Sequence, residues 1–298
     1  MTERNDIMDN ILKLKAFTET ASCKSFTDAA KKLSCSQSGI SRMIADLEKE
    51  WNVTLMERGR GGVSLTPEGE ALLPYARRIC SAQEDIESMV AGINGLVTGK
   101  IRIGTFSSVA THWLPRIIRM FRLDYPDVAY ELLLGDYGEI ESWVREGRVD
   151  IGFTCRTDDS DLHNEFLARD RLMAVVPEDH KLAGSEVFPL AELAKGPFML
   201  LEKGDKAEIS ELFEKNGLEP ETVFVTWDDY AVMSMVENGL GVSILPELIL
   251  RRIPYNIAVR PIDVPAYRDI CVIMRDKDRI SVSAKRFLRY LKYRDLPV

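Results

Sequence analysis

The chain has 298 residues, which exceeds the usual size of a single core and predicts more than one domain. Its 45% hydrophobic and 29% charged residues are typical of a globular protein. No apolar run reaches the roughly 18 residues of a membrane span, and the polar segment 1–10 is unlike a signal peptide, so we expect a cytoplasmic protein without membrane contact. A formal net charge of −8 excludes a surface that is basic throughout.

Three amphipathic helices are the first predicted elements. Apolar residues recur at helical spacing between residues 11 and 47, and Ser25 is a good N-cap for the middle helix. A short polar break separates this helix from the third. Small Ala29 and Ala30 allow the two helices to cross closely, which is the geometry of a helix-turn-helix.

The third helix carries polar side chains opposite its apolar stripe. Gln and Ser at its start are types that read base edges and phosphates, and Arg42 one turn on can reach a guanine or the DNA backbone. The candidate DNA-binding residues of this segment are Ser36, Gln37, Ser38, Ser41 and Arg42. A helical hairpin without DNA contact would show the same stripe, and this segment alone leaves that alternative open.

A two-stranded wing is predicted next, over residues 55–66. Two short apolar runs flank a turn rich in arginine and glycine, and the glycines supply the turn. We expect Arg58 and Arg60 to contact phosphates, while a solvated hairpin tip is the alternative for both arginines.

A long helix follows the wing, with Thr66 as N-cap and Pro67 at its first position, and it extends to about residue 95. Its apolar residues alternate at intervals of three and four, which is a heptad seam that needs a partner helix. A helix packed on its own chain is the alternative. The seam consists of Leu72, Tyr75, Ile79, Ala82, Ile86, Met89 and Ile93.

The run from Leu14 to Gly69 resembles the winged helix of LysR-type transcriptional regulators. The resemblance rests on many fixed spacings over more than fifty residues, and it departs at Ser38, Trp51, Asn52 and Met56. It implies a homodimer or homotetramer that is joined through the long helix and binds double-stranded DNA at an inverted repeat. The matching residues are Phe17, Ser25, Phe26, Ala29, Ala30, Leu33, Ser36, Gln37, Ser41, Leu47, Glu48, Leu55, Arg58, Leu65, Thr66 and Gly69.

Charge is distributed unevenly between the two parts of the chain. Residues 1–66 hold 10 of the 39 Lys and Arg residues and 9 of the 47 Asp and Glu residues, so the acidity belongs to the remainder. A nearly neutral DNA-binding part must gain its affinity from locally placed cations and from binding two half-sites at once.

Strands and helices alternate after a short hinge at 96–100, among them a helix from about Ser108 to Tyr125 and a strand near Leu172 to Val176. This alternation predicts parallel-rich sheets with helices on their faces. The predicted fold class is therefore multi-domain α/β: a winged helix-turn-helix at 1–66, a linker helix at 67–95, and an effector-binding domain at 101–298. The resemblance implies that the domain has two lobes and is similar to periplasmic binding proteins. It divides the domain into lobe I, 101–168 with 269–298, and lobe II, 169–268.

A small-molecule effector is expected between the lobes, at the carboxyl ends of the strands. Ser108 is well placed to cap the helix after the first strand, and the hydroxyls there could hold a carboxylate, with simple N-capping as the alternative. Aromatic residues at two positions imply a partly aromatic pocket, or one that is filled and senses nothing. The resemblance implies that the candidate effector-binding residues are Phe106, Ser107, Ser108, Thr154, Glu202 and Trp227, the last being alternatively a lobe-edge core residue.

The sequence contains no recognisable motif for catalysis or metal binding. Its three histidines, at 112, 163 and 180, lie outside any HExxH pattern, and no GxSxG occurs, so we expect neither an enzyme nor a cofactor or metal. The five cysteines are scattered and lack metal-ligand spacing; structural thiols are the simplest interpretation, and a redox sensor using Cys155 and Cys271 is an alternative.

The sequence therefore predicts a DNA-binding transcriptional regulator that is modulated by a small molecule. The resemblance implies that effector binding alters the placement of subunits, and with it the DNA bend or the contact with RNA polymerase. A small-molecule-binding module without a role in transcription is the alternative from another class.

Overall fold

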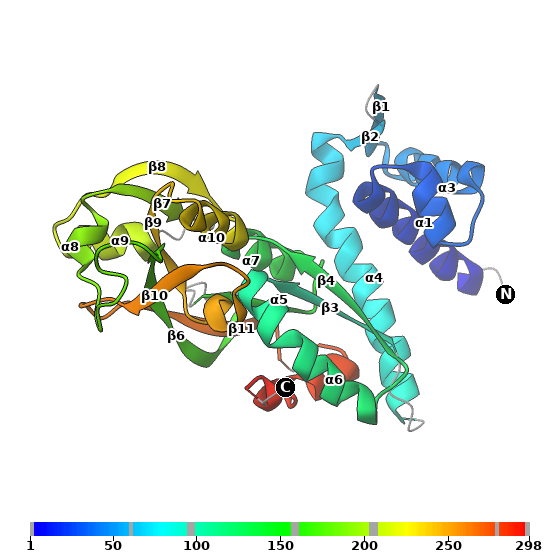
Figure 1. The fold of residues 1–298 in the computed structure, drawn as a ribbon. Coiled ribbons are helices and arrows are strands. Elements are labelled where there is room, and N and C mark those ends of the chain that lie inside the picture. Colours follow the sequence, from blue (N-terminus) through cyan, green and yellow to red (C-terminus); the bar gives the residue numbers. More distant parts are fainter. Residues whose placement is uncertain are drawn as a thin grey trace. The chain divides into compact units, whose positions relative to one another are not determined.

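The computed structural model describes residues 3–59, 62–93, 99–155, 161–202, 208–277 and 280–295. The chain forms two compact units, residues 1–96 with 146–148 and the remainder. The elements of the first unit are α1 (Glu3–Cys23), α2 (Phe26–Lys32), α3 (Gln37–Trp51), β1 (Met56–Gly59), β2 (Gly62–Leu65) and α4 (Pro67–Ile93) (Figure 1).

Local capping explains where the helices of the first unit begin and end. The Ser25 and Ser36 hydroxyls accept hydrogen bonds from the backbone N–H groups at the starts of α2 and α3. Asn52 ends α3 in the left-handed conformation, with φ of 54°. The Thr66 hydroxyl accepts the Gly69 N–H at 2.9 Å and thereby caps α4. These observations confirm the predicted starts of the helices.

One apolar core holds α1, α2, α3, the wing and the first half of α4 together. Ala29 and Ala30 are buried at the contact of α2 with α3, as the small side chains predicted. The buried residues of this core are Leu14, Ala16, Phe17, Ala29, Ala30, Ile40, Ile44, Leu47, Leu55, Met56, Leu73, Ala76 and Cys80. The first unit therefore folds around residues from its four helices and β1, with Val63 and Leu65 of β2 packed against them.

The second unit is built on a sheet of nine strands in the order β4-β3-β5-β11-β6-β9-β7-β8, with β10 also paired to β6. Its strands are β3 (Gly99–Thr105), β4 (Val128–Leu134), β5 (Ile151–Cys155), β6 (His163–Pro177), β7 (Pro197–Leu201), β8 (Glu221–Thr226), β9 (Val242–Pro246), β10 (Ile257–Pro261) and β11 (Tyr267–Met274). Its helices are α5 (Ser107–His112), α6 (Leu114–Asp124), α7 (Tyr137–Arg145), α8 (Leu190–Leu193), α9 (Glu208–Lys215), α10 (Asp229–Glu237), η1 (Ile249–Arg252), α11 (Val282–Leu288) and η2 (Leu291–Tyr293).

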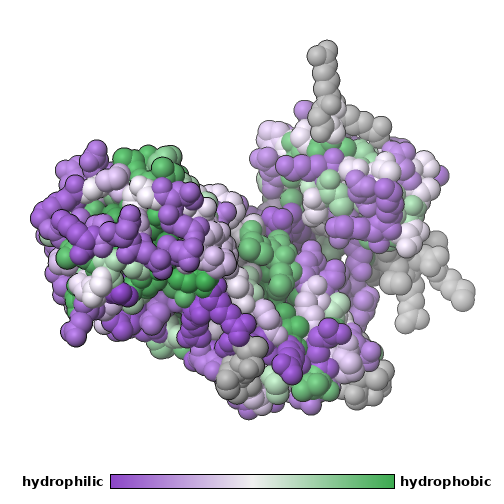
Figure 2. All heavy atoms as spheres, viewed as in Figure 1, coloured by the Kyte–Doolittle hydropathy of each residue, from purple (hydrophilic) through white to green (hydrophobic). Residues whose placement is uncertain are grey.

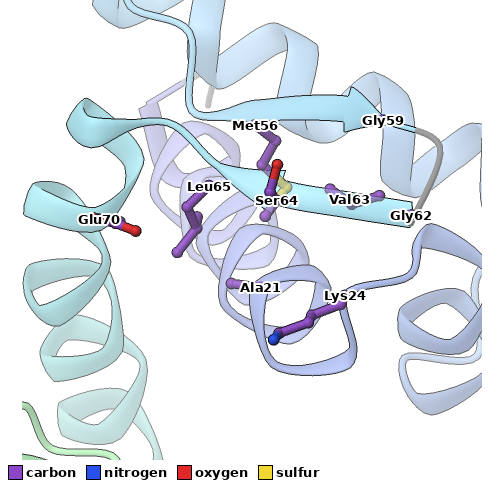
Figure 3. Close-up of a pocket in the computed structure, with 9 residues that line it drawn as sticks. All are labelled: Ala21, Lys24, Met56, Gly59, Gly62, Val63, Ser64, Leu65 and Glu70. Atoms are coloured by element: carbon purple, nitrogen blue, oxygen red, sulfur yellow. The ribbon is translucent and has the colours of Figure 1, made fainter.

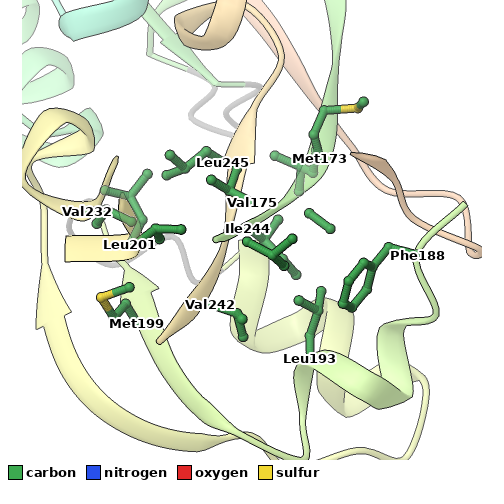
Figure 4. Packing of buried hydrophobic residues seen from close by; sticks show 14 of the residues in the cluster. Met173, Val175, Phe188, Leu193, Met199, Leu201, Val232, Val242, Ile244 and Leu245 are labelled. Atoms are coloured by element: carbon green, nitrogen blue, oxygen red, sulfur yellow. The ribbon is translucent and has the colours of Figure 1, made fainter. Parts of the chain in front are cut away.

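Two separate apolar cores divide the second unit into two lobes. Lobe I surrounds a core that includes Ile103 and Phe153, and lobe II surrounds one that includes Val175 and Ile244. Figure 4 shows the lobe II core, where side chains from β6, β7 and β9 meet those of α8 and α10. In Figure 1, β7 to β10 gather at one end of this unit and β3, β4 and α6 at the other.

The two lobes are joined by strands that are longer than the sequence suggested. A strand was predicted over 172–176, whereas β6 is one continuous strand of 15 residues that pairs with β11 in its first part and with β9 and β10 in its second. β11 is antiparallel to both β5 and β6, so parallel pairing is confined to the outer strands of each lobe.

The helix predicted from Ser108 to Tyr125 is divided into α5 and α6. The division falls at Trp113, directly before Leu114 and Pro115; a proline has no N–H to donate within a helix and is tolerated best in a first turn. Phe106, and not Ser108, occupies the N-cap of α5, and its side chain makes no capping bond. The prediction that Ser108 caps this helix is therefore wrong.

Candidate DNA-reading face and effector cleft

The candidate DNA-reading face lies at the start of α3. Gln37, Ser38 and Arg42 are exposed, and the Arg42 side chain is 86% exposed with its Nε 4.0 Å from Asp46. Ser36 differs from them, because its hydroxyl accepts the Gly39 N–H at 3.0 Å and lies 3.2 Å from the Ser38 hydroxyl. Ser41 is half-buried. The predicted residues thus lie together in the first two turns of α3, with Ser36 acting as the helix cap.

The wing is fixed to α3 and α1 by backbone and carboxylate contacts. One oxygen of Glu48 in α3 accepts the N–H groups of Leu55 and Met56, at 2.7 and 3.1 Å. The Val63 N–H of β2 donates to the Lys24 carbonyl at 3.2 Å. Figure 3 shows Val63 and Lys24 lining the same hollow, between the wing strands and the end of α1. These contacts orient β1 and β2 relative to the reading helix.

A glycine is required where α4 leaves the wing. A Cβ at Gly69 would lie 2.1 Å from the Leu55 carbonyl oxygen, well inside the contact distance of any side chain. The close approach lets the Thr66 hydroxyl donate to the Thr54 carbonyl at 2.6 Å while it caps α4. The wing and the linker helix therefore share one rigid junction.

Some predicted positions fall outside the described residues. Arg60 is one of them, and so are positions 96–98 of the expected hinge. The backbone of Arg58 lies in β1, opposite Val63. Phosphate contact by the wing arginines stays a prediction.

The seam of α4 is largely exposed within the single chain. Tyr75, Ile79, Ile86, Met89 and Ile93 are all exposed, while Leu73 and Ala76 on another side of the helix enter the core of the first unit. Leu72 is half-buried against that core, and Ala82 is exposed. Among the residues that the structure describes, no helix of the same chain covers this whole seam. On the face seen in Figure 2, hydrophilic residues predominate and apolar areas interrupt them.

A buried ionic cluster occupies the second unit where the lobes meet. The Arg268 guanidinium donates from Nε and Nη2 to one oxygen of Asp170, at 2.9 and 2.7 Å. Its Nη1 donates to the Tyr137 hydroxyl at 2.9 Å, and its Nη2 also donates to the Ser108 hydroxyl at 2.7 Å. The guanidinium carbon lies 5.0 Å from the centre of the Phe106 ring. Each of these side chains is buried.

The pKa values of this cluster follow from its burial. Burial alone would lower the pKa of Arg268, but the neighbouring Tyr137 hydroxyl and the paired Asp170 carboxylate outweigh it and hold the pKa above the ordinary value. Burial raises the pKa of Tyr137 well above its usual range, and it does the same for the neighbouring Cys155 thiol. The Arg268–Asp170 ion pair thus lies beside neutral hydroxyl and thiol groups, with Glu208 next to the Cys155 thiol.

The predicted effector-binding residues are divided between this cluster and other places. Phe106 and Ser108 belong to the cluster, and Ser107 begins α5 beside them. The Thr154 hydroxyl, which is buried, donates to Glu141 at 3.3 Å. Glu202 follows β7, its N–H donating to Thr226 at the end of β8.

Trp227 follows that same end of β8 and is 62% exposed. The alternative that treated it as a core residue is therefore wrong. Trp227 therefore lies at an exposed edge of lobe II, and its contact with a ligand stays a prediction.

Sequence reasoning missed Asp170, Tyr137 and Arg268. One signal was available: an Arg-Asp dipeptide occurs at 169–170 and again at 268–269, each directly before an apolar strand. In the antiparallel register of β6 and β11, Arg268 faces Asp170 and Asp269 faces Arg169. The register itself, which connects positions nearly a hundred residues apart, was not predictable from either segment.

The two cysteines of the redox alternative project from opposite faces of the sheet. Cys155 in β5 is paired with Ile270, and Cys271 in β11 is paired with Thr154. Directly opposed residues share a face and successive residues alternate, so the two thiols point away from each other. Neither forms a disulfide, and both are buried. A disulfide between them would require rebuilding of these strands, and the observation favours structural thiols.

Comparisons with known proteins agree with this architecture. Residues 11–70 match the family model described as "Bacterial regulatory helix-turn-helix protein, lysR family", and residues 94–295 match "LysR substrate binding domain". Together the matches extend over both compact units. Among the helices of the described residues, none is long and apolar enough to cross a membrane.

Full-length relatives give the same result. The chain is 31% identical over 290 residues to the uncharacterized HTH-type transcriptional regulator YwbI of Bacillus subtilis, covering 95% of this chain and 96% of that protein. It is 30% identical over 274 residues to the HTH-type transcriptional regulator BenM of Acinetobacter baylyi, covering 89% and 90%.

Solved structures share the fold. A crystal structure of CbnR, a LysR family transcriptional regulator, has a TM-score of 0.71 at 23% identity and covers 96% of this chain and 99% of that one. Full-length CbnR in complex with its target DNA gives a TM-score of 0.69 at 25% identity, covering 95% and 99%.

Proposed function

The chain belongs to the LysR family of DNA-binding transcriptional regulators, and we propose that it binds an inverted-repeat operator through α3 and the wing. Gln37, Ser38, Ser41 and Arg42 enter the major groove in this proposal, and Arg58 and Arg60 hold phosphates of the backbone. It acts in the cytoplasm as a regulator and not as an enzyme.

The observation that carries this proposal is the exposed polar face at the start of α3, backed by a buried apolar face. Ile40, Ile44 and Leu47 are buried, whereas Gln37, Ser38 and Arg42 point to solvent. A helix-turn-helix places the N-terminal part of its second helix against base edges, which is where these polar side chains lie. The Glu48 contacts add support by keeping the wing beside this helix.

We propose that two chains pair through the seam of α4, as a dimer or as part of a tetramer. The exposed residues of the seam recur at heptad spacing, and burying them against a second copy would remove apolar surface from water. Pairing would bring two reading helices to two half-sites, and the first unit needs such bivalency because its charge is nearly balanced.

We propose the following division of the chain: DNA-binding domain 1–66, linker helix 67–95, hinge 96–100 and effector-binding domain 101–298, with lobes at 101–168 plus 269–298 and at 169–268. The support is the pair of apolar cores in the second unit. A small-molecule effector, with a carboxylate as the expected group, binds between the lobes near Ser108. Its binding changes the placement of subunits, and so the DNA bend or the contact with RNA polymerase.

Fluorescence anisotropy of the full chain tests the DNA-binding proposal. The protein is titrated against a duplex from its own upstream region and against a random duplex, at several salt concentrations. We expect tighter binding to the upstream duplex, with affinity for both falling steeply as salt rises because phosphate contacts release counterions. Equal affinity for both duplexes at every salt concentration would contradict sequence-specific reading by α3.

A further inference from the structure

Two ion pairs of the same chemistry occupy adjacent positions on β6 and β11. Arg268 pairs with Asp170, and Asp269 pairs with Arg169 at the next position of the antiparallel register. Successive strand residues point to opposite faces, so one pair is buried while the other faces solvent. The Arg268 side chain is 1% exposed and the Arg169 side chain is 60% exposed. The exposed pair is a natural control for the buried one.

The buried pair connects segments that come from both lobes. One Asp170 oxygen accepts two N–H groups of Arg268, and the other accepts the Leu248 N–H at 2.9 Å. Leu248 follows β9 of lobe II, and its side chain packs in the lobe I core. On the other side, Arg268 holds Ser108 of α5 and Tyr137 of α7, both in lobe I.

The pair lies where the chain passes between the lobes. Asp170 is among the last residues of β6 that pair with β11, and Leu172 is already paired with β9. A change in the angle between the lobes must be absorbed near this point, because the strand itself runs through it. Contacts at Asp170 and Arg268 are therefore placed to control that angle.

We propose that Arg268 is a positioning residue that sets the orientation of the two lobes and links Ser108 to the point where they join. A ligand that engages the Ser108 hydroxyl would compete with Arg268 for that group and so disturb the contacts at the crossing strands. This last link rests on the proposed effector site, whereas the control of lobe orientation does not.

Cys155 supplies a readout of the lobes that is independent of DNA. Its thiol is buried in hydrogen-bonding contact with Tyr137 of lobe I and Glu208 at the start of α9 in lobe II. Opening of the lobes should expose it. Cys271 is also buried but lies on the opposite face of the sheet, so it reports unfolding of lobe I and not separation of the lobes.

The experiment compares Arg268→Ala and Arg169→Ala in the full chain. Labelling of Cys155 and Cys271 by iodoacetamide is timed under native conditions and quantified by peptide mass spectrometry. We expect Arg268→Ala to accelerate labelling of Cys155 at least tenfold while Cys271 stays within about twofold of the wild type. Arg169→Ala should change neither rate by more than about twofold, because its ion pair lies in solvent.

Chemical rescue distinguishes positioning from general stabilisation. Millimolar methylguanidinium chloride offers planar N–H donors to Asp170, Tyr137 and Ser108, so it should restore Cys155 protection in Arg268→Ala. Sodium chloride at equal concentration should not. Parallel acceleration at Cys155 and Cys271, or an unchanged Cys155 rate, would overturn the proposal.

Ser108→Ala keeps the test valid if Arg268→Ala does not fold. It removes one acceptor of Arg268 and leaves the ion pair intact. A selective rise in Cys155 labelling of about threefold is expected, and no rise would overturn the proposal. Failure of the wild-type chain to bind DNA would contradict the proposed function alone, because the labelling experiment contains no DNA.

Discussion

The start of α3 and the cluster around Arg268 use polar residues in opposite ways. On α3, the side chains of Gln37, Ser38 and Arg42 are turned outward, and the apolar face beneath them supports the helix. In the cluster, Ser108 and Arg268 are buried and bound to other parts of the same chain. The first region is exposed, as contact with an external partner would require, whereas the hydrogen bonds of the second are made within the chain. Regulation at the second region must therefore rearrange existing contacts.

The largest expected effect comes from breaking the buried ion pair. Asp170→Asn leaves the Arg268 charge uncompensated, and we expect the free energy of unfolding of the second unit to fall by about 3–5 kcal/mol. Urea unfolding followed by tryptophan fluorescence measures it, since Trp113, Trp143 and Trp227 all lie in this unit. Asp269→Asn, at the exposed pair, should cost at most about 1 kcal/mol. Equal losses of unfolding free energy in Asp170→Asn and Asp269→Asn would contradict the claim that the buried pair contributes more to stability than the exposed pair.

A smaller loss is expected when the wing is detached from α3. Glu48→Ala removes the acceptor of two backbone N–H groups, and hydrogen bonds to charged groups are worth about 1.5–3 kcal/mol. We expect about 2–3 kcal/mol less protection from amide exchange in α1 and α3, with weaker binding to every DNA sequence. Glu50→Ala is the control, because Glu50 is exposed and lies 3.9 Å from Lys13. A similar loss in Glu50→Ala would show that charge, and not the wing contact, matters.

Arg42→Ala tests the outward-facing side chains themselves. If Arg42 reads a guanine, the variant should lose about 1–3 kcal/mol on the operator and little on random DNA. Arg58→Ala should instead weaken binding to both duplexes and flatten the salt dependence. Anisotropy titrations of both variants measure the two patterns. Equal losses on both duplexes for Arg42→Ala would argue that it holds phosphate.

The smallest expected effect concerns His112, a buried residue of α5. Burial lowers the pKa of His112, so the unfolded chain takes up a proton at a higher pH than the folded chain. Its stabilising contribution is therefore complete above the unfolded pKa of about 6.5 and is lost as the pH falls through and below that value. Thermal unfolding should lose less stability between pH 7.5 and 5.5 in His112→Gln than in the wild type. His163→Gln, at an exposed histidine, should behave like the wild type.

The contrast between the two regions also explains what the sequence could predict. Helix starts at Ser25 and Thr66, and the outward face of α3, follow from periodicity and capping within a few residues. The hydrogen-bond partners of Ser108 do not follow from local patterns, because they depend on the register of β6 against β11, which connects residues 98 positions apart. The predicted capping role of Ser108 was wrong for this reason: a hydroxyl that could close a helix locally is held by a distant arginine. The division into α5 and α6 at Trp113 was likewise hidden by a continuous apolar pattern.

Amide hydrogen exchange of the full chain, with and without operator DNA, tests the contrast most directly. We predict that exchange in the segment 37–42 slows when DNA binds, because this face meets the groove. The Leu248 N–H, which donates to Asp170, should exchange slowly in both states. Unchanged exchange at 37–42 in the DNA complex, or rapid exchange at Leu248 in the free protein, would contradict the assignment of α3 to an external partner and of the Arg268 cluster to an internal one.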